Sequence, residues 1–383
     1  MNRNILFLIL GVILVGAVVL MNSDLDLKKP EVVADIKPAV IYDMGGKFDK
    51  SFNEGVWNGV QKFTEETGVE VMEFEVTNET QREQAMRRMV ERGATIVLGV
   101  GFAQADAIAA VAADNPDVQF SIIDVSWLDS PNLRQYAFKE HEGSYLVGVA
   151  AAKASQTNKV GFVGGMDIPL ISRFACGYVG GVKSVSANAE IYQNMTGSTP
   201  SAWNDPAKGA ELTRSQIDRG ADVVYHAAGG TGVGVIQAAA DAGKLAIGVD
   251  SNQNGLAPGS VLTSMLKRVD VAVETQIAAV VGGTWAAGVT ELGLAEGGVG
   301  ITDMEFTNEA KTGDHDGDGT SNFDEVAALA DEIKAGNIVV VSDYDALNAL
   351  TFTATPETAS APFPIIASFI AVISAIGLVR RRN

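Results

Sequence analysis

A short acidic stretch near the C-terminal end of this 383-residue chain has the residue types and spacing of a calcium-binding loop. The sequence DHDGDGTSNFDE, residues 314–325, places oxygen-bearing side chains at alternating positions, with a glycine in the middle and a glutamate at the end. Calcium prefers oxygen ligands, and an EF-hand loop supplies them in this pattern. The alternative is an acidic loop that is only solvated. The predicted metal ligands are Asp314, Asp316, Asp318, Thr320, Asn322 and Glu325.

Three features of this loop are typical of a single extracellular calcium loop rather than of a cytosolic sensor pair. Ser321 stands where paired EF-hands have an apolar residue, no clear helix is predicted before the loop in 303–313, and the chain holds one copy of the motif. We therefore expect Ca²⁺ to have a structural role here, fixing the C-terminal helix to the body of the protein.

The overall composition excludes several classes of function. The net charge is −19, from 28 basic and 47 acidic residues, which argues against a nucleic-acid partner because a phosphate backbone needs a basic face. One cysteine, Cys176, excludes an internal disulfide framework, iron–sulfur clusters and CxxC zinc sites. None of the three histidines is at metal-ligand spacing from another, so hydrolytic metal chemistry is not expected.

Both ends of the chain carry predicted membrane or targeting segments. Residues 1–24 combine a basic start with a long apolar run, typical of a signal or an anchor, and no cysteine follows that would make a lipoprotein. Residues 346–362 are a Thr/Pro/Ala spacer, and 363–383 form a second apolar stretch with an arginine-rich end, an anchor or a sorting signal. The positive-inside rule then predicts an extracytoplasmic, membrane-anchored protein at the cell surface.

The body of the chain alternates short apolar runs with amphipathic helical stretches, which predicts an α/β fold with parallel sheets covered on both faces. The series breaks near His141, so we expect two doubly wound lobes. The predicted first lobe comprises 37–140 and about 252–285, and the second 141–251 and about 286–345. The predicted strands are 39–43, 69–76, 95–101, 118–124, 159–165, 222–230, 244–250 and 260–266.

Polar residues follow several of these strands, at the sheet edge where ligands bind in such folds. Asp43, Asp124 and Asp250 end apolar strands, and they either accept hydrogen bonds from a ligand or cap the following turns. After Asp43, the loop MGGKFDKSFNEG leads into a helix for which Ser51 and Glu54 are expected to form a capping box. Phe52 and Asn53 at that helix start are expected to face the cleft, with a core position for Phe52 as the alternative.

Two further features near strand ends are less specific. Lys267 follows a strand and either donates to a ligand or is solvated. The segment AAGGTGVGV, 227–235, lies between a strand and a helix, but it misses the GxGxxG pattern of a dinucleotide site. Its backbone amides can hold any polar ligand.

Four stretches together resemble the basic membrane protein family, the substrate-binding proteins of ABC importers that include PnrA-like purine nucleoside receptors. The resemblance covers about residues 37–300, with a further match at 333–340, where the helix after the acidic loop is expected to run into the family's last strand. It implies a type I periplasmic-binding-protein fold, with two parallel-sheet lobes joined by three crossovers, a nucleoside in the cleft, and an ABC permease and ATPase as partners. The stretches are IYDMGGKFDKSFNEGVWNGV, VGFVGGMDIPLISRFACGYVGG, YHAAGGTGVGV and VDSNQNGLAPGSVLTSMLKRVDVAV.

The resemblance also implies roles for individual residues. Phe52 would stack on one face of the base and Trp203 on the other, Asp124 would bind the base edge, and Asp250 would take the ribose hydroxyls. The remaining predicted contacts are Asp43, Asn53, Gly229, Gly230 and Lys267.

The chain departs from the family pattern in two places. The lipoprotein cysteine is absent, and the acidic loop replaces the helix before IKAG. The C-terminal tail resembles the sorting or anchor segments of archaeal surface proteins.

The sequence therefore predicts an extracytoplasmic substrate-binding protein for purine nucleosides rather than an enzyme. Three alternatives stay open. The same scaffold can bind a flavin, a sugar or a signalling molecule; the Gly-rich segment can serve a dinucleotide-dependent enzyme; or the protein can be a calcium-dependent surface sensor or adhesion protein.

Overall fold

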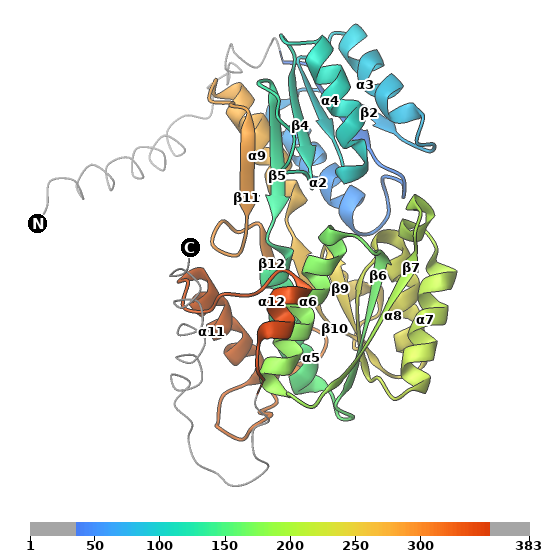
Figure 1. Cartoon of the computed structure of the whole chain (residues 1–383), viewed down its shortest axis with the longest axis vertical. Coiled ribbons are helices and arrows are strands. Elements are labelled where there is room, and N and C mark those ends of the chain that lie inside the picture. The colour runs from blue at the N-terminus through green and yellow to red at the C-terminus, as the bar shows by residue number, and fades with distance from the viewer. Residues whose placement is uncertain (1–35, 353–383) are drawn as a thin grey trace, which may run out of the picture. The chain divides into compact units, whose positions relative to one another are not determined.

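A computed structural model describes residues 36–352, which form the body of the protein (Figure 1). The predicted terminal segments 1–24 and 363–383, and most of the predicted spacer, lie outside these residues, so their anchoring role stays a prediction. No helix within 36–352 is both long enough and apolar enough to cross a membrane.

The first of two sheets has the strand order β11-β5-β4-β3-β1-β2, and all of its strand pairs are parallel. Short runs of buried apolar residues form its central strands, as expected for a parallel sheet covered on both faces. The strands are β1 (Pro38–Tyr42), β2 (Met72–Glu75), β3 (Ile96–Gly99), β4 (Gln119–Ile123), β5 (Leu133–Phe138) and β11 (Gly288–Leu292). The helices of this lobe are α2 (Phe52–Thr67), α3 (Gln81–Glu91), α4 (Ala105–Asp114) and α9 (Val269–Val281), with the short η3 (Phe102–Gln104).

The second sheet has the order β12-β10-β9-β8-β6-β7 and is parallel except for the antiparallel pair of β12 with β10. Its strands are β6 (Lys159–Met166), β7 (Glu190–Gly197), β8 (Val223–Ala227), β9 (Leu245–Asp250), β10 (Val261–Lys267) and β12 (Val299–Ile301). Its helices are α5 (Glu140–Ala154), α6 (Pro169–Val185), α7 (Pro206–Asp218) and α8 (Gly232–Asp241), with the short η4 (Pro200–Trp203), η5 (Gly229–Thr231) and η6 (Asn254–Leu256).

The chain crosses between the two sheets three times within the described residues. It passes to the second sheet after β5, returns after β10, and passes again between β11 and β12. Backbone hydrogen bonds join the crossings, from Lys139 N to Leu292 O (3.0 Å) and from Arg268 N to Gly298 O (2.8 Å). This topology confirms the predicted fold class, a type I periplasmic-binding-protein fold with two parallel-sheet lobes and three crossovers.

The division of the later chain between the lobes differs from the sequence-based one. The range 252–285 was expected in the first lobe, but β10 pairs with β9 of the second sheet, and only α9 returns to pack against α2. Conversely, β11 pairs with β5 of the first sheet although it lies in the range expected for the second lobe. An apolar strand such as β10 can pair with strands of either sheet, because its hydrophobic pattern does not determine which strand lies beside it. Strands β5, β7, β11 and β12 were not predicted; β11 is mostly exposed, and β12 has three residues.

Helices α5 and α6 pack closely against each other and hold part of the site. The contact depends on glycines, since a Cβ at Gly181 would overlap the carbonyl oxygen of Tyr145, and one at Gly177 would overlap that of His141. Larger residues would push the helices apart and displace the first turns of both, where Glu140 and Arg173 lie.

The C-terminal segment of the described chain covers these two helices. Helices α10 (Asn308–Thr312) and α11 (Asn322–Lys334) flank the acidic loop, α11 packs against α5, and α12 (Tyr344–Ala349) packs against α6 (Figure 1). The sequence interpretation expected a last strand after α11, which was wrong: residues 335–352 contain α12 and no strand. Asp343 instead starts a helix by accepting a hydrogen bond from Ala346 N.

Candidate functional site

A cleft opens at the carboxyl ends of the strands of both sheets, between the two lobes. Eight of the nine predicted ligand-binding residues line it: Asp43, Phe52, Asn53, Asp124, Trp203, Gly229, Asp250 and Lys267. Gly230 does not line the cleft; it is buried, and a Cβ built there would lie 3.3 Å from the carbonyl oxygen of Trp203.

The start of α2 faces the cleft because Asp49 caps it. The Asp49 carboxylate accepts hydrogen bonds from the backbone N–H groups of Ser51 (2.8 Å), Asn53 (3.0 Å) and Glu54 (3.1 Å). The predicted Ser51–Glu54 capping box was therefore wrong, since the Ser51 side chain makes no capping bond. The Ser51 hydroxyl is free to reach across the cleft, and Phe52 and Asn53 are held on the cleft wall.

Asp43 lines the cleft but is already paired. Arg82 donates to its carboxylate from Nη2 (3.0 Å) and Nε (3.2 Å). Burial raises the pKa of the Asp43 carboxyl, and the Arg82 charge opposes this shift. The Asp43 carboxylate can therefore still accept a hydrogen bond from a ligand, but Arg82 balances most of its charge.

Asp124 and Asp250 share an unusual backbone conformation at the ends of β4 and β9. Their φ angles are +69° and +64°, in the left-handed region that non-glycine residues seldom adopt. Such conformations are found at functional sites, where the surrounding structure holds the side chain in one direction. Both carboxylates line the cleft, in agreement with the prediction from their positions after apolar strands.

Asp250 also joins the two lobes, because the Ser51 hydroxyl donates a hydrogen bond to its Oδ2. Burial raises the pKa of Asp250 to about 7; Lys267 opposes this rise, and the nearby charges of Asp49 and Asp124 add to it. The carboxylate of Asp250 is thus a hydrogen-bond acceptor whose ionisation is poised near neutral pH.

Lys267 is buried rather than solvated, with 2% of its side chain exposed. Its Nζ lies 2.6 Å from Asp124 Oδ1 and 3.1 Å from Glu140 Oε1. The rings of Phe52, Phe138 and Phe174 surround it at 5.1–5.6 Å. The ammonium is therefore fixed at the floor of the cleft by charge and by aromatic faces.

Aromatic and apolar side chains form the remaining walls. Trp203, at the end of η4, lies against Gly165, where a Cβ would overlap the indole ring. Several lining residues were not predicted. Those on α6 belong to a pattern of apolar residues that is typical of a helix packed in the core. The signal that could have identified them is that α6 follows β6 at the sheet edge where ligands bind. The unpredicted lining residues are Met44, Asp49, Gly101, Phe102, Leu170, Ile171, Phe174, Ala227 and Val249.

The lobes touch at the rim of the cleft. Gln253 Nε2 donates to Lys50 O (2.8 Å), and the Ser251 hydroxyl donates to Ser51 O (3.1 Å). Val249 N donates to Gln253 Oε1 (2.9 Å), which fixes the orientation of this amide toward the opposite lobe. These bonds hold the two lobes together at the edge of the cleft.

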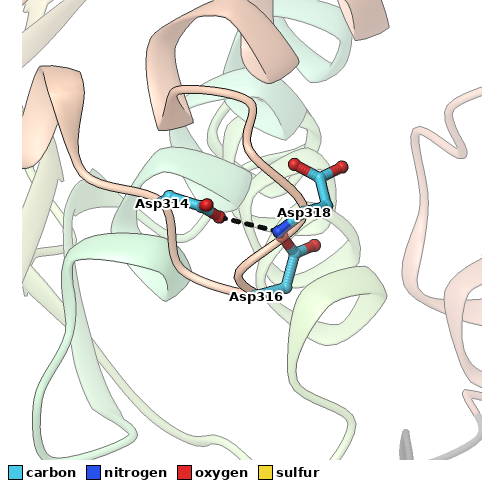
Figure 2. Close-up of side chains that lie close together, drawn as sticks. All are labelled: Asp314, Asp316 and Asp318. Atoms are coloured by element: carbon cyan, nitrogen blue, oxygen red, sulfur yellow. Dashed lines mark hydrogen bonds between the residues drawn. The ribbon is translucent and has the colours of Figure 1, made fainter. Parts of the chain in front are cut away.

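The acidic loop brings together half of its predicted ligands. Carboxylate oxygens of Asp314, Asp316 and Asp318 lie within 4.8 Å of one another (Figure 2). Asp314 accepts hydrogen bonds from the backbone N–H groups of Gly317 (2.7 Å), Asp318 (3.1 Å) and Gly319 (2.9 Å), which curl the loop around it. This cluster of oxygen donors fits the chemistry of a calcium site.

Two of the other predicted metal ligands, Glu325 and Asn322, have side chains bound to other groups. Glu325 forms an ion pair with the buried Lys153 of α5. The Asn322 side chain donates to Ala310 O (2.9 Å) and accepts from His315 N (3.2 Å). The backbone N–H of Thr320 donates to Asp318 Oδ1 (2.7 Å). The short helix α10 also precedes the loop, where no clear helix was predicted.

Comparison with known proteins agrees with this geometry. Residues 36–325 match the Bmp family, described as ABC transporter substrate-binding protein PnrA-like. The chain belongs to the Bmp family.

Relatives and solved structures agree with this assignment. The ABC transporter nucleoside-binding protein BmpA of Lactococcus lactis is 33% identical over 82% of this chain and 91% of its own length. The CD4+ T-cell-stimulating antigen of Listeria monocytogenes is 34% identical over 80% of this chain and 92% of its own. A crystal structure of an ABC transporter solute-binding protein from Aeropyrum pernix has a TM-score of 0.71 at 30% identity, covering 82% of this chain and 96% of that one.

Membership in the Bmp family establishes the general activity of this protein. The protein is a substrate-binding protein of an ABC transporter and not an enzyme. A protein of this kind works outside the cytoplasm and partners with the permease and ATPase of its transporter.

Proposed function

We propose that this Bmp-family protein binds purine nucleosides in the interlobe cleft and delivers them to an ABC importer. The observation that supports this most is the combination of aromatic walls, Phe52 and Trp203, with the carboxylates of Asp124 and Asp250. A planar base needs aromatic surfaces, and a ribose needs acceptors for its vicinal hydroxyls. The name of the Lactococcus lactis relative, a nucleoside-binding protein, points the same way.

The charges of the cleft favour a nucleoside over a nucleotide. Among the described residues that line the cleft, Lys267 is the only cation, and it is paired with Asp124. Four aspartates line the same cleft. A phosphate group would meet these carboxylates without a free cation to bind it, so an uncharged ligand fits best.

The proposal predicts that adenosine, guanosine or inosine stabilises the purified protein against heat. A ligand present at about 100 times its Kd should add roughly 2.7 kcal/mol to the free energy of unfolding. Thermal shift and titration calorimetry measure this effect, with ribose and the matching 5′-monophosphates as controls. If none of the three nucleosides binds, whereas a sugar or a flavin does, the purine assignment is wrong and the scaffold serves another ligand.

We also propose that the acidic loop binds Ca²⁺ as a structural ion. The clustered oxygens of Asp314, Asp316 and Asp318 support this, and Glu325 is near enough in the chain to complete the site after leaving Lys153. Because Lys153 is buried, losing its partner costs free energy and should weaken the calcium affinity. The ion would tie the start of α11 to the loop.

Calcium is therefore expected to raise the melting temperature of the wild-type protein relative to a chelator, by an amount that grows with the logarithm of its concentration. The double variant Asp316→Asn with Asp318→Asn should lose this response, since it removes two charged ligands. Nucleoside affinity should be the same with and without calcium. Identical melting curves in calcium and chelator would contradict the ion site, and calcium-dependent nucleoside binding would instead favour a sensor.

A further inference from the structure

Four charged side chains cluster at the floor of the cleft, and only two of them line it. Three are buried, whereas 30% of the Arg173 side chain is exposed. We call this group the floor cluster: Asp124, Glu140, Arg173 and Lys267. Asp124 and Lys267 line the cleft, whereas Glu140 and Arg173 do not. Lys267 Nζ lies between Asp124 Oδ1 (2.6 Å) and Glu140 Oε1 (3.1 Å), and Arg173 Nε donates to Glu140 Oε2 (2.8 Å).

The floor cluster sits where the chain crosses between the lobes. Glu140 is the first residue of α5, directly after the first crossing, and Lys267 ends β10, directly before the second. Asp124 belongs to the first lobe, and Arg173 lies on α6 of the second. Glu140 is completely buried, and Lys267 and Arg173 are the two cations that balance its charge.

The pKa shifts of Glu140 and Lys267 both favour the charged forms of these groups. Burial alone would raise the pKa of Glu140, but Lys267 and Arg173 outweigh it and lower the value. Burial would lower the pKa of Lys267, but Asp124 and Glu140 outweigh it and raise the value. Burial raises the pKa of Asp124, and the charge of Lys267, whose Nζ lies 2.6 Å from the carboxylate, opposes this rise. When Asp124 is ionised, the cluster holds two carboxylates against two cations and is formally neutral.

We propose that Glu140, supported by Arg173, is a positioning residue that fixes Lys267 and keeps the cleft floor neutral, so that the cleft selects ligands with an uncharged base. Sharing the ammonium with Glu140 leaves Asp124 with acceptor capacity for the N–H groups of a base. Without Glu140, the floor would carry one excess positive charge, which attracts an anionic base. This selection rests on the proposed nucleoside function.

The test compares guanosine with xanthosine, whose base is largely anionic at pH 8. The measured quantity is the ratio of the Kd of xanthosine to that of guanosine, from calorimetry at pH 8. Glu140→Gln should lower this ratio roughly tenfold or more, because the floor becomes positive. Arg173→Gln should raise it, because the floor becomes negative. The double variant restores the formal charge balance and should return the ratio toward that of the wild type.

A matched control is Glu211→Gln, which changes an exposed carboxylate paired with Lys208 and should leave the ratio unchanged. A purely structural role for Glu140 would weaken both nucleosides equally, so an unchanged ratio in Glu140→Gln overturns the proposal. If Glu140→Gln does not fold, the test uses Arg173→Gln and the double variant instead. A Kd ratio that Arg173→Gln leaves unchanged or lowers would also overturn the proposal.

Failure of the nucleoside function is distinguishable from failure of this inference. If the wild type binds no nucleoside, the ligand-free proteins are compared by amide hydrogen exchange in the crossings 138–141 and 267–268. Each single variant should exchange faster there than the wild type, and the double variant should recover part of the protection. Equal exchange in all four proteins overturns the positioning role.

Discussion

Replacing Asp250 with alanine should weaken nucleoside binding by roughly 10²–10⁴-fold while changing the affinity for free purine bases by less than about tenfold. The carboxylate lies at the end of β9 with its side chain in the cleft, where it can accept both ribose hydroxyls. Hydrogen bonds to a charged group contribute about 1.5–3 kcal/mol each, which gives the expected range for two. Calorimetry with guanosine and guanine measures the difference.

The control for this variant is Asp241→Ala, an exposed aspartate at the end of α8, which should leave both affinities unchanged. An equal loss for nucleoside and base would contradict the ribose role and indicate that Asp250 acts by holding the lobes together through Ser51.

The raised pKa of Asp250 leads to a prediction about how nucleoside affinity depends on pH. Its pKa of about 7 in the folded protein is above the ordinary value, so its contribution to stability is present at low pH and is lost as the pH rises through 7. Ribose hydroxyls favour the ionised carboxylate, so nucleoside affinity should rise over the same interval. Asp250→Asn should remove this pH dependence, and a wild-type affinity that is flat between pH 5.5 and 8 would contradict it.

Replacing Lys267 with methionine should lower the free energy of unfolding by about 3–5 kcal/mol, because two buried carboxylates lose their shared cation. Asp124 and Glu140 would be left with Arg173 alone, which contacts only Glu140. Urea denaturation of the ligand-free protein measures the loss. The deficit should shrink as the pH falls, since protonation removes the unpaired charge.

Lys334→Met is the matched control, because Lys334 forms an exposed pair with Asp331 on the surface of α11. Exposed pairs contribute at most about 1 kcal/mol, so this variant should stay close to the wild type. A similarly small loss for Lys267→Met would mean that water reaches the floor cluster and screens its charges.

Several parts of the site could be predicted from local sequence. The aspartates at 43, 124 and 250 stand out because each ends an apolar run, and a parallel strand delivers its last residue to the ligand-binding edge. Phe52 and Asn53 were placed correctly although the capping prediction was wrong. Asp49, rather than Ser51 and Glu54, caps the helix, and either choice starts α2 at the same residue.

Other parts had no local signal. In the sequence, Glu140 and Arg173 look like ordinary charged helix residues. Their roles could not be predicted because they depend on Lys267, which is more than ninety residues away in the chain. The assignment of β10 and β11 to sheets was also wrong. Hydrophobic alternation indicates which face of a strand is buried, but it does not indicate which other strand pairs with it.

The sequence by itself determined the α/β class, the two-lobed plan, the strand-end aspartates and the spacing of the acidic loop, since each depends on residues close together in the chain. Only the tertiary structure decided which carboxylates are paired, that the Ser51 hydroxyl reaches Asp250 across the cleft, and that Glu325 of the acidic loop lies against Lys153. The physical reason is that burial and charge pairing arise between elements distant in sequence, and they set the ionisation and direction of each side chain only after the lobes have closed on each other.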